Sequence, residues 1–384
     1  MTTNDYNKFR FFFDKIIRDY HGNLSREMKH ITDWDTGFAN YDVRKLGQDE
    51  LSMRVCVGRN LVGFNLPGYM SKDERIKFER MMMPAFDELI KKYGGKVHSL
   101  TPDFGNAGGN PNLISLEHYK ELVDKHIMFK DMAVNLYLKS AGISDHWPHG
   151  RGCWQSEDNM RIIWFGEEDQ LRIMCMKKSS DLLEVFSNLN EMLCTVESIK
   201  GIKFAKDENY GYVTSCPSNL GTGMQASVHV KIPNLTSDGT DKKAKEICKA
   251  LGLSVRGTGG EHAPIGTDGT VEISPSARLF IKECEIISKL YGGIEKLMAI
   301  ENPSAEPISE HGSKNVEQSA ENNNSLSARK EEDEPTMPTT TGEGTVERCT
   351  DAATSEIDNK SSAQSMPSPR SLNMSPSPIL SLTN

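Results

Sequence analysis

Several features that are common in other proteins are missing from this chain of 384 residues. No apolar run is long enough to span a membrane, and the first residues mix charged and apolar side chains, so no signal peptide is expected. The eight cysteines form no C-x-x-C pair, so neither a zinc site nor a disulfide framework is predicted, and a reducing, cytoplasmic location is expected. The net charge of −9 argues against nucleic-acid and membrane-surface partners, so a phosphate site would need a local cluster of arginines.

Common nucleotide-binding signatures are missing as well. The chain has no G-x-x-x-x-G-K-[ST] sequence, and the glycine-rich run Gly257–Gly260 leads into a loop, whereas a dinucleotide-binding motif needs a helix there. Arg54, Arg172 and His229 lie on the polar faces of predicted strands, and Arg256 immediately precedes the glycine run. Residue pattern alone therefore predicts an α+β protein with a candidate anion site.

The composition changes sharply near Asn302. Residues 303–384 are rich in Ser, Thr, Glu, Asn and Pro and nearly lack aromatic residues, so they bury too little apolar surface to offset their ordering entropy. A disordered tail is predicted. Three Ser-Pro steps near its end suit a proline-directed kinase, although ordinary low-complexity sequence is the preferred interpretation; they begin at Ser368, Ser375 and Ser377.

In the first half of the chain, three helices are predicted. Residues 5–20 place their apolar side chains on one helical face, and Gly22 ends the run. Ser71–Glu74 is a capping box that opens a long helix, which continues through Pro84 to a pair of glycines. A third helix is predicted over residues 115–126.

Apolar and polar residues alternate over Leu51–Val57, which predicts a strand with Arg54 and Cys56 on its polar side. Two runs, 160–165 and 171–176, flank a short acidic loop as the strands of a hairpin do.

Further strands are predicted over residues 225–231 and 271–273. The second is expected to lead directly into the last helix, with Ser274 as its cap and Pro275 at its first position. Several connections are too short for parallel crossovers, so the fold class is α+β, with a largely antiparallel sheet flanked by helices.

Four strings of residues carry a resemblance to a known family. They are WPHGRG from Trp147, WFGEEDQLRI from Trp164, CPSNLGTGMQASVHVKIP from Cys216 and RGTGGEH from Arg256. They resemble W-P-x-G-R-G, W-V-N-E-E-D-H-L-R-I, CPSNLGT followed by VHVKLP, and R-G-T-x-G-E-H of the phosphagen (ATP:guanidino) kinases. The pair Glu261-His262 is closest to the arginine kinases. The resemblance covers roughly residues 9–301 in unbroken order.

The resemblance implies a glutamine synthetase-like catalytic domain that transfers the γ-phosphoryl group of Mg-ATP reversibly to a guanidinium nitrogen, with Mg-ADP as the other nucleotide. Because magnesium is then held mainly by the phosphates, no protein metal site is expected. By motif match, the carboxylates of Glu168 and Glu261 grip the guanidinium, and the Cys216 thiolate lies beside it. The implied ATP-binding positions, which clamp phosphates or contact adenine, are Ser52, Arg54, His126, Arg172, His229 and Arg256.

Two positions depart from the family pattern. Cys56 and Gln225 stand where the family places phosphate-clamping arginines, so the ATP site is interpreted as degraded. Losing one preorganised donor at a developing charge costs about 10²–10³ in rate, which predicts reduced activity. Arg59 and Lys231 are candidates to compensate, and Gln225 keeps an amide donor.

The resemblance also suggests a domain plan. Residues 1–45 are interpreted as a remnant of a linker that follows an N-terminal helical domain, 46–302 as the catalytic domain and 303–384 as the tail. That helical domain holds the loop that selects the guanidino substrate and is expected to be missing. The acceptor therefore stays open between free arginine, another guanidino compound and protein-bound arginine, as in bacterial protein-arginine kinases. A pseudokinase that acts as a nucleotide-binding or regulatory protein is the alternative from another class.

We predict that residues 303–384 are dispensable for folding, because they lack the apolar side chains that a core requires. Limited proteolysis should trim the chain near Pro303 and leave a resistant fragment, and a variant ending at Asn302 should melt at the same temperature as the full chain. A protease-resistant tail, or a truncated chain with a markedly lower melting temperature, would contradict this prediction.

Overall fold

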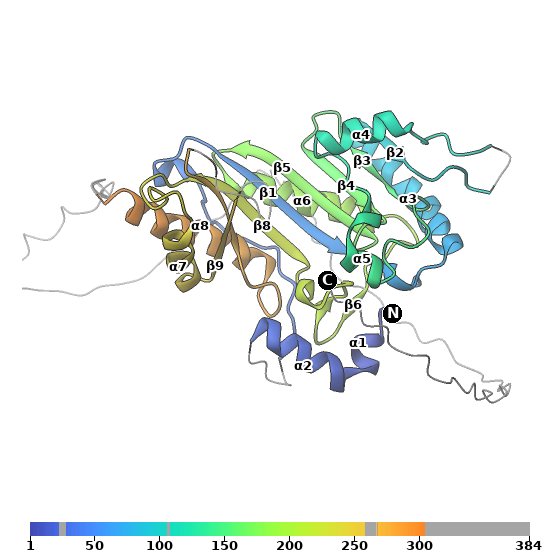
Figure 1. The fold of residues 1–384 in the computed structure, drawn as a ribbon, viewed down its shortest axis with the longest axis horizontal. Helices are drawn as coiled ribbons and strands as arrows, with labels where there is room; N and C mark the ends of the chain where they lie inside the picture. Colours follow the sequence, from blue (N-terminus) through green and yellow to red (C-terminus); the bar gives the residue numbers. More distant parts are fainter. Residues whose placement is uncertain (23–27, 106–107, 258–265, 267, 304–384) are drawn as a thin grey trace, which may run out of the picture. The chain divides into compact units, whose positions relative to one another are not determined.

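The computed structural model describes residues 1–22, 28–105, 108–257, 266 and 268–303. Its centre is one antiparallel sheet of eight strands in the order β2-β3-β4-β5-β1-β8-β10-β9, which confirms the predicted fold class (Figure 1). A separate two-stranded ribbon consists of β6 (Lys206–Asp207) and β7 (Gly211–Tyr212). The strands of the large sheet are β1 (Leu51–Arg59), β2 (Lys96–Ser99), β3 (Gly152–Gln155), β4 (Arg161–Phe165), β5 (Leu171–Ser179), β8 (Met224–Lys231), β9 (Leu253–Arg256) and β10 (Thr270–Pro275).

One face of this sheet is buried under the long helices α3 (Lys72–Tyr93), α6 (Leu182–Glu197) and α8 (Glu283–Glu301), while α7 (Lys242–Ala250) packs on β9. The predicted alternation in β1 is confirmed: Leu51, Met53, Val55 and Val57 face these helices and are at most 3% exposed. Burying each such side chain stabilises the fold by about 1.5–3 kcal/mol, which fixes this face of the strand as the core face. No helix in the described part of the chain is long and apolar enough to cross a membrane.

The opposite face, which we call the site face, is covered over only part of its width. A second apolar cluster packs there on β3, β4 and β5, and it is built from α4 (Leu116–Asp124) and side chains between Met128 and Ile143. The part over β1, β8, β10 and β9 carries partly exposed polar side chains instead. The short elements of this layer are η3 (Met132–Val134) and α5 (Leu136–Ser140).

The predicted starts of two helices are confirmed. At α3, the Ser71 hydroxyl accepts from the Glu74 N–H at 3.2 Å, and the Glu74 carboxylate accepts from the Ser71 N–H at 3.1 Å. The helix contains Pro84 and ends at Gly94, which has a φ of +64°. At α4, the Ser115 side chain accepts from a backbone N–H of the first turn. Both caps occupy N–H groups that a helix start would otherwise leave unpaired.

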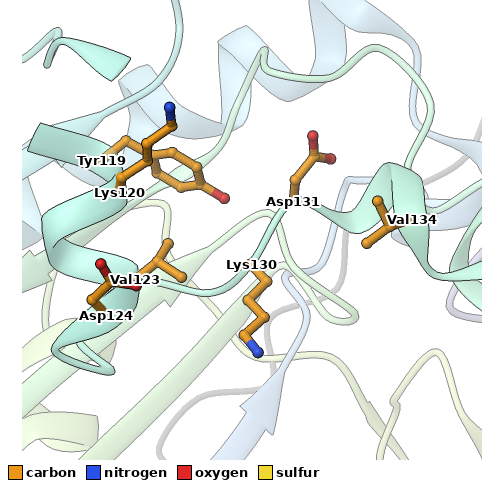
Figure 2. A pocket seen from close by; sticks show the side chains of 7 residues that line it. All are labelled: Tyr119, Lys120, Val123, Asp124, Lys130, Asp131 and Val134. Atoms are coloured by element: carbon orange, nitrogen blue, oxygen red, sulfur yellow. The ribbon is translucent and has the colours of Figure 1, made fainter. Parts of the chain in front are cut away.

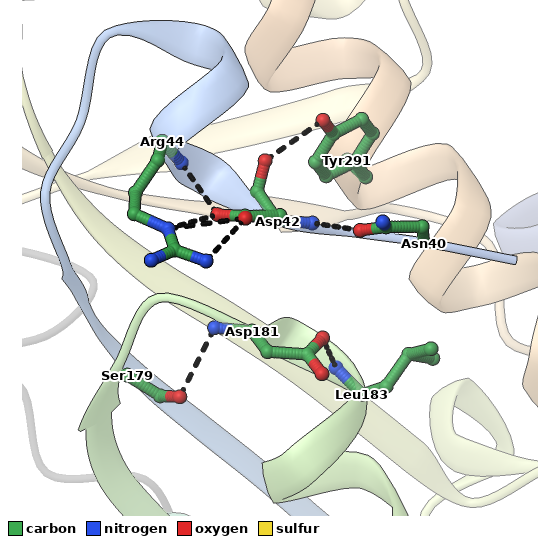
Figure 3. Close-up of polar contacts among 7 residues, drawn as sticks. All are labelled: Asn40, Asp42, Arg44, Ser179, Asp181, Leu183 and Tyr291. Carbon is green, nitrogen blue, oxygen red and sulfur yellow. Dashed lines mark hydrogen bonds and ion pairs between the residues drawn. The ribbon is translucent and has the colours of Figure 1, made fainter.

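Two capped turns fix the chain just before β1 (Figure 3). The Asp42 carboxylate caps the short helix η1 (Val43–Leu46) by accepting from the Arg44 N–H at 3.0 Å, and its carbonyl accepts from the Tyr291 hydroxyl of α8. Asp181 caps α6 by accepting from the Leu183 N–H at 2.9 Å. The backbones of Asp181 and Asp42 form an isolated antiparallel β-bridge. These contacts hold the entry into β1 against both α6 and α8.

The N-terminal segment differs from its prediction. The predicted helix over residues 5–20 is two helices, α1 (Asp5–Lys8) and α2 (Arg10–His21), separated at Phe9. Only part of the predicted apolar face is buried: Ile17 is 1% exposed, whereas Phe12 is 54% exposed. The reason is tertiary, because α2 packs on the short helix η4 (Pro217–Asn219), which is too small to cover the whole face.

The predicted start of the last helix is wrong. Ser274 and Pro275 continue β10 and pair with Ser254 and Leu253 of β9, and α8 begins at Glu283. The pairing of β10 with β8 ends at Ile273, so the missing N–H of Pro275 removes no bond to β8.

Candidate functional site

Four strands bring polar side chains into one line on the site face. Ser52 of β1 is paired with His229 of β8. On β10, Glu272 is paired with His229 on one side and with Arg256 of β9 on the other. Directly paired residues of an antiparallel sheet project from the same face, so these four side chains are neighbours. The structure thus brings together three residues that were predicted from the sequence. Glu272 was not predicted from the sequence, although its position between the apolar residues Val271 and Ile273 indicates that it lies on the polar face of its strand.

Two arginines of this face have unused donors. The Nη2 of Arg54 donates to the sulfur of Met174 at 3.1 Å, and its Nε is buried with no partner among the described residues. The Nε of Arg256 is likewise buried and has no partner among the described residues. A buried donor without an acceptor costs about 1–3 kcal/mol, so both guanidinium groups suit an anion that supplies several oxygens.

The two positions interpreted as replaced arginines are neighbours in the sheet. Cys56 is paired with Gln225 of β8 on one side and with Met174 of β5 on the other. Along β1, Cys56 lies between Arg54 and Gly58, and Gly58 is paired with Arg172 of β5. The site face therefore carries two uncharged side chains side by side here, and we call this stretch the gap at Cys56. Only the sheet register reveals this, since the two positions are far apart in the sequence.

Neither residue that could have compensated is placed to do so. Arg59 points to the core face, where its guanidinium lies 3.4 Å from the centre of the Tyr212 ring and donates to the carbonyls of Gly58 and Thr222. Lys231 is 68% exposed and forms an ion pair with Asp268 at 2.9 Å. The gap at Cys56 is therefore not filled by either cation.

The acidic loop between β4 and β5 places two carboxylates next to Arg172. The guanidinium Nη2 of Arg172 is 3.2 Å from Glu167 and 3.4 Å from Glu168. Burial, and then the neighbouring Asp169 carboxylate, raise the pKa of Glu168 to about 7, although Arg172 opposes this shift. A pKa in this range suits a carboxylate that accepts a proton at neutral pH.

Cys216 lies on the loop that ends in η4, and this loop packs against the acidic hairpin. Its Sγ is 2.9 Å from the Ser218 hydroxyl, and its carbonyl accepts from the Thr214 hydroxyl at 2.8 Å. The carbonyl of Thr214 in turn accepts from the buried hydroxyl of Tyr6 at 2.9 Å. The N-terminal segment thus supports the Cys216 loop, a role for which the sequence offered no signal because the two residues are 208 positions apart.

His126 lies in the turn that follows α4. Its backbone is left-handed, with a φ of +59°, and its N–H donates to the Val123 carbonyl at 3.0 Å. The next carbonyl, of Ile127, accepts from the indole N–H of Trp164 at 2.6 Å, which ties this turn to β4. The His126 side chain is exposed, and its contact with adenine stays a prediction.

A pocket of about 250 Å³ lies between α4 and the segment that leads to η3 (Figure 2). It contains none of the predicted site residues. Its lining consists of Tyr119, Lys120, Val123, Asp124, Lys130, Asp131 and Val134. The predicted site is instead the open, polar part of the site face. Glu261, the second predicted carboxylate, lies outside the described residues, as does most of the glycine-rich run.

Comparison with known proteins identifies the family. Residues 77–304 match the family described as ATP:guanido phosphotransferase, C-terminal catalytic domain. The testis isozyme of creatine kinase from Oncorhynchus mykiss is 37% identical over 77% of this chain and 74% of its own length. Arginine kinase from Turbo cornutus is 33% identical over 76% of this chain and 77% of its own. The crystal structure of lombricine kinase matches with a TM-score of 0.68 and 28% identity, over 78% of this chain and 79% of that one.

These relatives are named for three different guanidino compounds, so the comparisons support a phosphotransferase without separating the acceptors. The match to the family covers more than half of the chain, and relatives more than 30% identical are covered over about three quarters of their length. On these grounds the chain belongs to the ATP:guanido phosphotransferases, the phosphagen kinase family.

Proposed function

We propose that this chain transfers a phosphoryl group reversibly between a nucleotide and a guanidino compound, with a weakened phosphate clamp. The observation that carries the proposal is the position of Arg172, whose guanidinium lies 3.4 Å from Glu168 and next to the strand that holds Arg54. A cation suited to a phosphate and a carboxylate suited to a guanidinium are thus side by side. Family membership favours an enzyme, and nothing in the comparisons favours the pseudokinase alternative.

The chemistry follows from these groups. Arg54, Arg172 and Arg256 would bind the nucleotide phosphates, and magnesium carried by the nucleotide would offset part of their negative charge. Glu168 would hold the guanidinium and accept its proton as the new P–N bond forms and the bond to the ADP oxygen breaks. Alignment of the two substrates supplies most of the remaining rate enhancement.

The acceptor is proposed to be arginine or a close guanidino analogue, on the strength of Glu261-His262 in the sequence. A coupled phosphotransfer assay should compare free arginine, creatine, taurocyamine, lombricine and an arginine-rich protein. Transfer to a free guanidino compound supports the proposal, and transfer to the protein alone would point to a protein-arginine kinase. Tight nucleotide binding without any transfer would overturn the proposal in favour of the pseudokinase.

Nucleotide binding should be measurable but weak. Each lost charged contact costs about 1.5–3 kcal/mol, or roughly one to two decades in affinity, and this site lacks charge at Cys56 and at Gln225. Calorimetric titration with Mg-ADP is the direct measurement. A submicromolar dissociation constant would show that the phosphate clamp is intact after all.

Acceptor binding should depend on pH through Glu168. Burial raises the pKa of this carboxyl to about 7, so its charged form, which the guanidinium requires, is lost as the pH falls below that value. We expect kcat/KM for the acceptor to fall about tenfold per pH unit below pH 7. Glu168→Gln should lower the activity and remove this fall in kcat/KM below pH 7, which is the acid limb of the pH profile. The matched control is Glu184→Gln, which removes a remote carboxylate paired with Lys177 and should leave the limb in place.

Restoring arginine at the two replaced positions should raise turnover. Cys56 and Gln225 are neighbours on the site face, so the double change Cys56→Arg with Gln225→Arg would fill the gap between Arg54 and Arg172. Even one restored donor at a transferring phosphoryl group is worth about a hundredfold, so at least that gain is expected in the coupled assay. Each single change should do less than the pair, because groups that act on one transition state are not additive.

The control for added charge is Ser288→Arg, which places an arginine on an exposed position of α8, on the other side of the sheet. It should leave turnover unchanged. A folded double variant that binds ATP and remains as slow as the parent would mean that the lost arginines are not what limits the protein.

A further inference from the structure

A buried carboxylate that the proposed chemistry does not use connects the two halves of the acceptor site. Asp169 is 4% exposed and lies at the end of the acidic loop, directly after Glu168. Its Oδ1 accepts two hydrogen bonds, one from the Asn60 side chain at 2.8 Å and one from the backbone N–H of Ser215 at 2.6 Å. Ser215 directly precedes Cys216, so a single oxygen atom joins the two segments that carry Glu168 and Cys216.

The bonds around Asn60 make this connection rigid. The Asn60 amide also donates to the Val213 carbonyl at 2.9 Å, and its oxygen accepts from the Gln170 N–H at 2.9 Å. Gln170 is fully buried and accepts from the Leu61 N–H at 2.8 Å. The end of β1, the acidic hairpin and the strand before Cys216 are thus held by one buried network, in which each bond is worth more than at the surface.

A glycine in β1 makes room for this carboxylate. A Cβ atom at Gly58 would stand 2.5 Å from the Oδ2 of Asp169, which is closer than carbon and oxygen approach without a bond. Glycine weakens a strand and typically marks a site where another group approaches the backbone closely. Gly58 is also paired with Arg172, so the close approach occurs beside the residue that contacts Glu168.

We propose that Asp169 is a positioning residue, which sets the distance between the Glu168 carboxylate and the Cys216 thiol. It touches neither substrate in this proposal. It holds the Cys216 loop through Ser215, and its charge also acts on the neighbouring Glu168 carboxyl. The inference rests on the proposed function for its catalytic consequence, but the fixed position of the Cys216 loop is a property of the protein alone. A misplacement of about 1 Å at a reacting group can cost about a hundredfold in rate, so such a residue matters for catalysis without contributing chemistry.

The first test is Asp169→Asn, which keeps the shape of the side chain and weakens both hydrogen bonds by replacing a charged acceptor with a neutral one. With the acceptor that the assay identifies, kcat should fall by about a hundredfold. The dissociation constant of Mg-ADP should change less than kcat, because Asp169 acts on Arg172 only through its charge, whereas it holds the Cys216 loop through a direct hydrogen bond. The rate and pH profile of iodoacetamide alkylation at Cys216, followed by peptide mass spectrometry, should shift. Cys194, exposed on α6, should react unchanged in the same sample.

Asp158→Asn is the matched control. Asp158 likewise accepts from a backbone N–H, that of Met160 at 3.0 Å, but it holds the turn between β3 and β4, away from Cys216. This variant should leave the alkylation of Cys216 unchanged. A folded Asp169→Asn protein whose Cys216 alkylation matches that of the parent would overturn the proposal, and this result is independent of whether any phosphotransfer is found.

Two further measurements apply if Asp169→Asn fails to fold. In the parent protein, hydrogen exchange should show the Ser215 amide strongly protected, and rapid exchange there would overturn the proposal. Gly58→Ala should displace the Asp169 carboxylate without altering it chemically, and should shift Cys216 alkylation in the same direction as Asp169→Asn. An unchanged Cys216 in a folded Gly58→Ala protein would also count against the proposal.

Discussion

The site depends on the pairing of β1 with β5 on one side and with β8 on the other. In a strand, side chains alternate between two faces, so a register shift of one residue would turn Arg54 and Cys56 into the core and expose Val55 and Val57. Such a shift would be costly, because the core-facing side chains of β1 are at most 3% exposed and would lose this burial. Hydrophobic burial under α3, α6 and α8 therefore places polar groups on the site face, although those helices pack on the opposite face of the sheet.

Charge on the site face is unevenly balanced. At one end Arg172 lies within 3.4 Å of two carboxylates, while Arg54 and Arg256 each keep a buried Nε without a partner among the described residues. The gap at Cys56 separates these surroundings. An anion would therefore meet unused donors near Arg54, whereas at Arg172 it must compete with carboxylates that are already paired. We therefore expect nucleotide binding to be weak in the absence of an acceptor. It should become stronger when Glu168 binds a guanidinium in place of Arg172.

The Cys216 loop owes its position to distant parts of the chain. Asp169 holds it from the hairpin, Asn60 from the end of β1, and Tyr6 from the N-terminal segment. The Tyr6 hydroxyl is buried, and burial raises its pKa, so it acts as a neutral donor to the Thr214 carbonyl. Tyr6 is therefore part of the support of the Cys216 loop, and the interpretation of residues 1–45 as a linker remnant stays a prediction.

The sequence by itself determined the family, the antiparallel α+β fold, the alternation in β1, the capped start of α3 and the face on which Cys56 and Gln225 lie. All of these depend on local periodicity, short capping motifs or long matched strings, which neighbouring residues encode. Only the tertiary structure decided the break at Phe9, the continuation of β10 through Pro275, the adjacency of Cys56 and Gln225 and the clamp at Asp169. Those features depend on strand pairing or on contacts between segments that are distant in the sequence, such as Asp169 and Ser215, which are 46 positions apart. A local pattern carries no information about which distant backbone will supply the partner.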